Sequence, residues 1–163
     1  MNVILSSIVW TPLLFAVIAI FLPERDEEQR ARVRTIALAG AGLSFFATTF
    51  FGILGQIALG EGGGLASAYP ENHLWFSGCF FPAHYDLTAD GITLPLLVVT
   101  TTVFGCAIFH SWKIHVRVRL NVVLVLLPET ADNGVLCSPA VGLVVAFWCL
   151  PQLPFSLLIH RRG

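Results

Sequence analysis

Five long apolar stretches dominate the sequence and limit what it can fold into. They cover about 3–22, 35–59, 92–112, 120–137 and 140–159. A helix of about 20 apolar residues spans the hydrocarbon core of a bilayer, where lipid offers no partner to an unpaired backbone amide. With 56% hydrophobic and 12% charged residues, the chain is too apolar for a typical soluble domain. We therefore expect one all-α transmembrane domain over 1–163, with about five helices and an outer loop at 60–91.

All nine basic residues fall in connections that five crossings would place on one face. Four Arg lie between the first two stretches, three basic residues follow the third, and two Arg follow the fifth. The loop at 60–91 contains four acids and neither Lys nor Arg. The positive-inside rule makes the basic face cytoplasmic. We therefore predict that the N-terminus lies outside, on the periplasmic or lumenal side.

The sequence lacks the residues that several classes of function require. The net charge of −1 provides no basic field for a nucleic acid. The four Cys residues show neither CxxC pairing nor His-Cys spacing, so we expect no metal site and no disulfide framework. The glycine-rich run at 60–64 is not followed by Lys-Ser/Thr, and the chain has no dinucleotide fingerprint. We therefore expect no cofactor bound by this chain and no catalysis by the chain alone.

The fourth apolar stretch carries two acids, Glu129 and Asp132, near its middle. An ionised Asp at the centre of a membrane helix costs about 2.5–3.5 kcal/mol, whereas each Leu or Val returns only about 0.3–0.6 kcal/mol. This helix should therefore need protein neighbours. Residues three apart share a helix face, so both acids are candidates for a proton or ion path. The alternative is a helix broken at Pro128, because Asp-Asn-Gly at 132–134 is also a turn signature.

His110 is a further candidate for a proton path, since it ends the third stretch near Lys113. Its unperturbed pKa lies near physiological pH, which suits a proton relay at a membrane interface. Histidines at such interfaces are more commonly just solvated or paired, and that reading also stays open.

Several segments together resemble the antiporter-like membrane subunits of respiratory complex I. They are Ile8–Leu14, Tyr85–Leu96 with the run Asp-Gly-Ile-Thr-Leu-Pro, Asn133–Leu136 and Phe147–Ile159. The resemblance is to the NuoM/NdhD type of NAD(P)H-quinone oxidoreductase subunit, and Mrp cation/proton antiporter subunits share the pattern. It covers the whole chain, but only the N-terminal portion of such a subunit.

The resemblance implies a membrane-arm subunit, or a fragment of one, that contributes scaffold helices to a proton-translocating NAD(P)H-quinone oxidoreductase. It implies other membrane subunits and the lipid bilayer as partners. NAD(P)H or ferredoxin, quinone and iron–sulfur clusters would be bound by other subunits. The location implied is a bacterial plasma membrane or a cyanobacterial or plastid thylakoid membrane.

One position departs from the family in a way that bears on function. The family carries a Glu after Phe-Trp that is central to proton transfer, and this chain has Cys149 there. A thiol is a much weaker acid than a carboxylic acid and does not replace it.

Two other functions stay open. The chain could be a stand-alone product of a truncated or frameshifted gene, acting in assembly or interaction without pumping. It could also be a small transporter, although five helices cannot form two matched halves of three.

Overall fold

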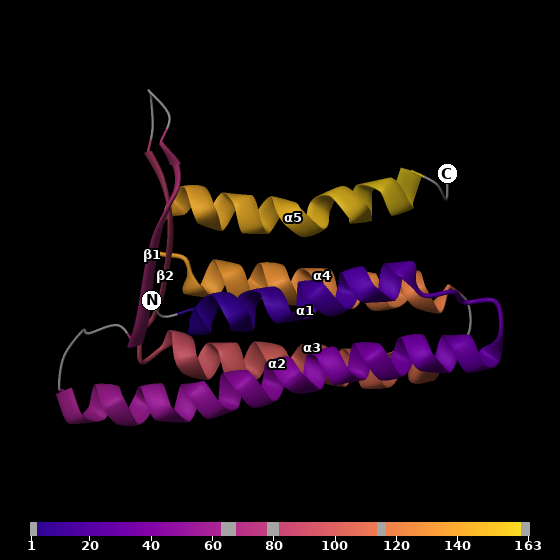
Figure 1. Ribbon diagram of the computed structural model, residues 1–163, viewed down its shortest axis with the longest axis horizontal. Helices are drawn as coiled ribbons and strands as arrows, with labels where there is room; N and C mark the ends of the chain where they lie inside the picture. Colours follow the sequence, from indigo (N-terminus) through magenta and orange to yellow (C-terminus); the bar gives the residue numbers. More distant parts are fainter. Residues whose placement is uncertain (1–2, 63–67, 78–81, 114–116, 161–163) are drawn as a thin grey trace.

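The computed structural model describes residues 3–62, 68–77, 82–113 and 117–160. Its helices are α1 (Ile4–Phe21), α2 (Glu27–Gly62), α3 (Thr93–His110), α4 (Val118–Cys137) and α5 (Val141–His160). They lie side by side and alternate in direction, as Figure 1 shows. Strands β1 (Ala68–Ser77) and β2 (Pro82–Ala89) cross one end of the bundle. We call this the hairpin end and the opposite one the basic end.

Four helices in the described part of the chain are long and apolar enough to cross a membrane. These segments are Ile4–Phe21, Glu27–Ile57, Thr93–Lys113 and Val118–Cys137. The fifth helix contributes a shorter apolar segment, Val141–Gln152. The molecule is therefore mostly helical, and its helices indicate an integral membrane protein.

Helix α2 is longer than the predicted 35–59. It has 36 residues and, at 1.5 Å per residue, extends about 54 Å, well beyond a hydrocarbon core of about 30 Å. Its first turns contain exposed ion pairs from Glu27 to Arg30 and from Glu28 to Arg32. Pairs at these spacings stabilise helices. The prediction missed this start because it followed apolar residues alone.

The chain is mostly helical as expected, but the described part of the connection at 60–91 contains two strands that an all-α chain would lack. β1 and β2 pair as an antiparallel hairpin, in which His73 lies opposite Tyr85 and Asn72 opposite Asp86. The described strands contain Tyr69, Trp75 and Tyr85, and aromatic residues favour extended structure. The ladder is irregular between Ala68 and Glu71, where Tyr69 has a positive φ of 56°. Because of this irregularity and the polar residues of the loop, the sequence shows no recognisable strand pattern there.

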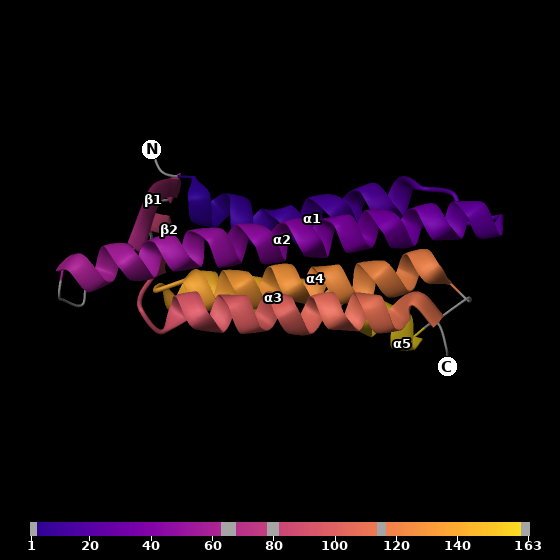
Figure 2. The ribbon, with the colours of Figure 1, turned by 90° about the horizontal axis from the view of Figure 1, so that it is seen from below.

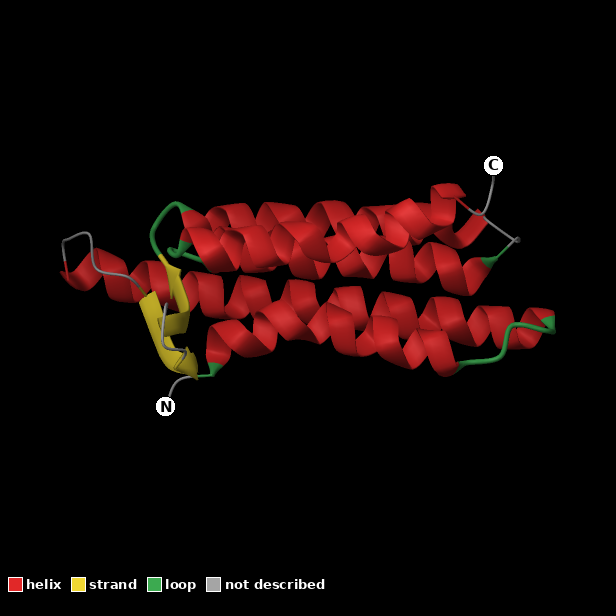
Figure 3. Cartoon of the chain, turned by 90° about the horizontal axis from the view of Figure 1, so that it is seen from above, coloured by secondary structure: helices red, strands yellow, loops and turns green. Residues whose placement is uncertain are grey.

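Helix α4 lies at the centre of the arrangement. The bundle has one layer of α1 and α2 and another that contains α3 and α4, as Figures 2 and 3 show. α4 packs against α1, α2, α3 and α5. It is the least apolar of the four spanning helices, and with 44% of its spanning window buried it is also the most enclosed. Contacts with the other helices thus provide the stabilisation that α4, with its polar residues, would lack in lipid.

The basic end ties α1 to α4 through charges that suit the helix dipoles. The Arg119 guanidinium donates to the carbonyls of Ile20 and Leu22 at the end of α1, at 3.2 and 3.3 Å. The Glu24 carboxylate accepts the backbone N–H of Arg119 in the first turn of α4, at 3.0 Å. Cations stabilise helix C-termini and anions stabilise N-termini.

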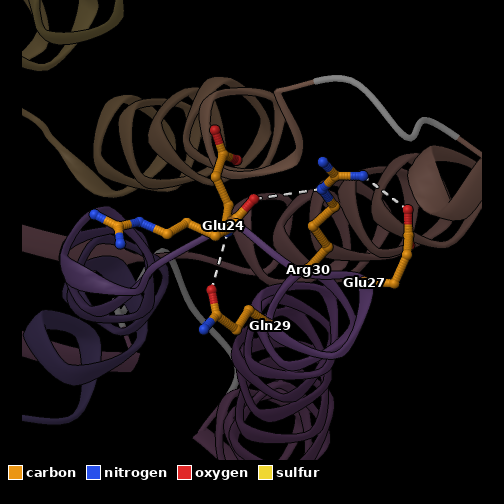
Figure 4. A network of polar contacts seen from close by, with 5 residues as sticks. Glu24, Glu27, Gln29 and Arg30 are labelled. Atoms are coloured by element: carbon orange, nitrogen blue, oxygen red, sulfur yellow. Dashed lines mark hydrogen bonds and ion pairs between the residues drawn. The ribbon is translucent and has the colours of Figure 1, made fainter.

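The turn between α1 and α2 is held by its own polar contacts, shown in Figure 4. Arg30 Nε donates to the Glu24 carbonyl at 3.4 Å, and Arg25 N donates to the Gln29 side chain at 2.9 Å. The connection from α3 to α4 lies at the same end of the bundle. Seven of the nine basic residues therefore lie near one end, within 25–34 and 113–119, and Arg161 and Arg162 lie outside the described residues.

Candidate functional site

Helix α4 continues through Pro128, so the alternative of a break at this residue was wrong. Residues 118–137 form one helix, and the Asp-Asn-Gly sequence is helical rather than a turn. Proline removes one helix hydrogen bond, but membrane helices tolerate it where neighbouring elements enclose the backbone. The four helices that pack against α4 enclose its buried face.

The two acids of α4 have different surroundings. Glu129 is fully buried with 0% exposure, whereas Asp132 lies on the outer surface of the bundle. Residues three apart point about 60° away from each other around a helix, because each residue turns about 100°. On α4 the boundary between the buried and the exposed face lies between Glu129 and Asp132. Of the two candidates for a proton or ion path on α4, Glu129 alone therefore faces the interior.

Glu129 belongs to a buried stripe that follows the inner face of α4. Its members are Val118, Val122, Leu126, Glu129, Asn133 and Cys137. The spacings of three and four residues keep all six on one face. Asn133 was not among the residues predicted from the sequence, although its position four residues after Glu129 places it on the same helix face.

The polar groups at the centre of this stripe lack partners among the described residues. Both carboxyl oxygens of Glu129 and both polar side-chain atoms of Asn133 make no hydrogen bond. Ser44 of α2 is buried and faces Glu129, but its hydroxyl makes no hydrogen bond of normal geometry. By contrast, the nearby hydroxyl of Thr130 donates to the Leu126 carbonyl at 3.1 Å.

His110 and Cys149, the other two sequence candidates, lie away from Glu129. His110 is exposed and lines a shallow, mainly apolar groove of about 470 Å³ between α2 and α3. Cys149 is exposed on α5 beside Trp148. The structure therefore does not bring the four sequence candidates together.

A second polar cluster, which sequence analysis missed, joins the hairpin to the start of α1. The buried Glu71 of β1 accepts the backbone N–H groups of Leu5 and Ser6 at 2.7 and 3.2 Å, and it also accepts the Ser6 hydroxyl. These N–H groups have no partner within their own helix, and an anion there is favoured by the helix dipole. Nothing in the local sequence marks Glu71, because its partners are 65 and 66 residues away.

Tyr85 of β2 extends this cluster toward α5. Its hydroxyl accepts the indole N–H of Trp10 at 2.9 Å, and Trp10 in turn packs on Phe147 with ring centroids 5.7 Å apart. Burial raises the pKa of Tyr85 above its usual value of 10.0. The cluster anchors the hairpin to α1 and, through Trp10, to α5.

The Asp-Gly-Ile-Thr-Leu-Pro run at 90–95 has a local structural role. Asp90 Oδ1 accepts the backbone N–H groups of Ile92 and Thr93 at 3.0 and 2.7 Å, which caps the start of α3. The hydrogen bond from Thr93 is the main cause of a lowered pKa for Asp90. The clearest motif of the sequence thus begins a helix and does not touch Glu129.

Comparison with known proteins relates the chain to one kind of membrane subunit. It is 26% identical over 159 residues to NAD(P)H-quinone oxidoreductase chain 4-2 of Synechocystis sp., which covers 98% of this chain and 27% of the relative. It is 26% identical over 160 residues to the chloroplastic chain 4 of Mesostigma viride, covering 98% and 30%. It is 28% identical over 165 residues to a chain 4 of Thermosynechococcus vestitus, covering 100% and 30%.

These alignments include essentially the whole chain. It is a homologue of the chain 4 proteins, corresponds to an N-terminal portion of them, and spans less than a third of their length. No protein-family model matches the sequence.

Proposed function

We propose that this chain is a membrane-arm subunit, or part of one, in a proton-translocating NAD(P)H-quinone oxidoreductase, where it contributes scaffold helices to an antiporter-like module. The observation that carries the proposal is the alignment of the whole chain with chain 4 proteins. The antiparallel bundle of apolar helices supports it, because a membrane arm is built from such helices.

The contribution of the chain to turnover is then positional and electrostatic. NAD(P)H or ferredoxin, quinone and the iron–sulfur clusters belong to other subunits of the complex in this proposal. Electron transport takes place there, and this chain is not catalytic alone. The membrane would be a bacterial plasma membrane or a thylakoid membrane.

The charge distribution supports an orientation with the hairpin end outside. The connections between α1 and α2 and between α3 and α4 carry seven basic residues at the opposite end. By the positive-inside rule that end is cytoplasmic or its equivalent. The hairpin would then lie on the periplasmic or lumenal side.

Helix α5 offers the surface that would meet the remainder of the assembly. It packs mainly against α4 and lies at one side of the bundle in Figure 1. Its outer face exposes Val141, Val145 and Trp148, with 77%, 49% and 65% exposure. Large exposed aromatic residues are typical anchors of interfaces, and Cys149 lies next to this one.

The experiment is native electrophoresis of the chain, tagged at its own locus and solubilised in mild detergent. We expect it to comigrate with other membrane subunits of a quinone oxidoreductase. Trp148→Ala should weaken this association, whereas Phe46→Ala, a matched change at a residue of α2 that is 71% exposed, should not. A monodisperse wild-type chain free of partners would contradict the proposal and favour a stand-alone membrane protein.

A further inference from the structure

The inner stripe of α4 changes its chemistry at Glu129. Toward the basic end its next members are Leu126, Val122 and Val118, which are buried in an apolar cluster with residues of α1, α2 and α3. Toward the hairpin end the next member is the polar Asn133, followed by Cys137, which is buried in a second apolar cluster with residues of α1, α3, α5 and the hairpin. Glu129 therefore lies between an apolar half of the stripe and the polar side chain of Asn133.

In the described part of the chain, the helices packed around Glu129 place no basic side chain beside it that would balance a negative charge. Helix α1 has no ionisable side chain, and α2 has none between Arg34 and Glu61. The ionisable groups of α3, Cys106 and His110, are both exposed. On α4 itself the neighbours are the exposed Asp132 and the buried Cys137, and α5 presents Cys149 outward.

An ionised carboxylate in this position would carry a large desolvation cost without a compensating partner. A neutral carboxylic acid avoids that cost and gains an O–H donor. The Ser44 hydroxyl, which faces it from α2, is a ready acceptor, and the free Asn133 amide is one helical turn away. The side-chain polar atoms of Ser44, Glu129 and Asn133 that make no hydrogen bond are the ones that a neutral Glu129 would pair.

We propose that Glu129 is a proton-binding site, held as a neutral acid between α2 and α4, which exchanges its proton with the hairpin end through Asn133. Release transfers the proton to water that reaches the acid beside the Asn133 amide and leaves the Glu129 carboxylate. Reprotonation reverses this step. The apolar members of the stripe block exchange with the basic end.

Beyond Asn133 the same face of α4 leads to the ionisable groups near the hairpin. Cys137 is two turns from Glu129, about 12 Å along the helix. Glu71 is close enough to Cys137 to act on it electrostatically, and it connects through Ser6 to Tyr85. The hairpin cluster would thus mark the outer end of the route. This inference goes beyond the proposed scaffold role and does not depend on assembly into a complex.

The test is infrared spectroscopy of the full chain reconstituted in vesicles, read at the carbonyl stretch of protonated carboxylic acids. We expect Glu129→Gln to remove one such band at neutral pH. Asp132→Asn, the matched change at the exposed acid, should leave that band in place. If Glu129→Gln removes no band, Glu129 is not a neutral acid and the proposal fails.

Hydrogen–deuterium exchange of the same band tests the route. Asn133→Leu should slow the exchange about tenfold or more, because it replaces the polar side chain that follows Glu129 on the stripe. Thr130→Val should leave the rate unchanged, because that hydroxyl is already bonded to a helix carbonyl. Equal exchange in wild type and Asn133→Leu, or equal slowing in Thr130→Val, would overturn a route through Asn133.

Ser44→Ala keeps the proposal testable if Asn133→Leu does not fold. It removes the acceptor that faces Glu129, so the band should move to the higher frequency of a less strongly bonded acid. An unchanged band would contradict the pairing of Glu129 with Ser44. The three infrared readouts are independent of comigration with other subunits, so this proposal and the proposed function fail separately.

Discussion

Substituting two glycines of α2 by alanine tests how closely α1 and α2 pack. A Cβ added at Gly40 would lie 2.6 Å from both Cβ and Cγ of Phe15 in α1. A Cβ added at Gly42 would meet nothing within 4 Å. The two positions are on the same helix and two residues apart, so they form a matched pair.

The magnitude follows from two opposing terms. Alanine is favoured over glycine in a helix interior by about 1 kcal/mol, and this gain applies equally to Gly40→Ala and Gly42→Ala. Gly40→Ala adds an overpacking cost, typically about 1–3 kcal/mol. Rotation of the ring about the Cβ–Cγ bond moves neither Cβ nor Cγ of Phe15, so the helices themselves must move apart. We expect Gly40→Ala to be less stable than Gly42→Ala by about 1–3 kcal/mol.

The assay is reversible unfolding in mixed micelles by increasing SDS, followed by tryptophan fluorescence. Residual helix in the SDS-unfolded state reduces the propensity gain, but this reduction is shared by both variants and cancels in their difference. Stabilities of Gly40→Ala and Gly42→Ala that agree within about 0.5 kcal/mol would refute the close approach of α1 and α2 at Phe15.

Two predictions concern the hairpin cluster. Glu71→Ala should lower the free energy of unfolding by about 1.5–3 kcal/mol in the same assay, because it removes charged hydrogen bonds to the first turn of α1, whereas the exposed Asn72→Ala should change it by under about 0.5 kcal/mol. If the two variants are equally stable, Glu71 does not cap α1. In a Tyr69→Phe chain Tyr85 is the only phenol, and its absorbance should titrate above pH 10.0. Because the pKa is raised in the folded state, Tyr85 contributes to the free energy of unfolding below pH 10.0, and this contribution is lost as the pH rises through the raised pKa. Titration at or below pH 10.0, or the same alkaline loss of stability in Tyr85→Phe, would contradict its burial.

The positions of the membrane helices could be read from the sequence because the bilayer imposes a simple length rule. The segments predicted at 3–22, 92–112, 120–137 and 140–159 agree with α1, α3, α4 and α5 to within a few residues. The exception is the basic start of α2, where ion pairs extend a helix through polar residues. The hairpin was missed because its strands are secured by distant contacts, such as that of Glu71 with Leu5.

At the candidate site, too, one part could be predicted from the sequence and another depends on the tertiary structure. Composition alone determined that α4 is too polar for lipid and must be surrounded by protein, because the cost of its acids outweighs its apolar residues. Only the tertiary structure decided that α4 stays continuous, that Glu129 faces inward with Ser44 and Asn133, and that Asp132 faces outward. Hydrophobicity depends on the residues of one segment, whereas the direction of a side chain depends on where the other four helices pack.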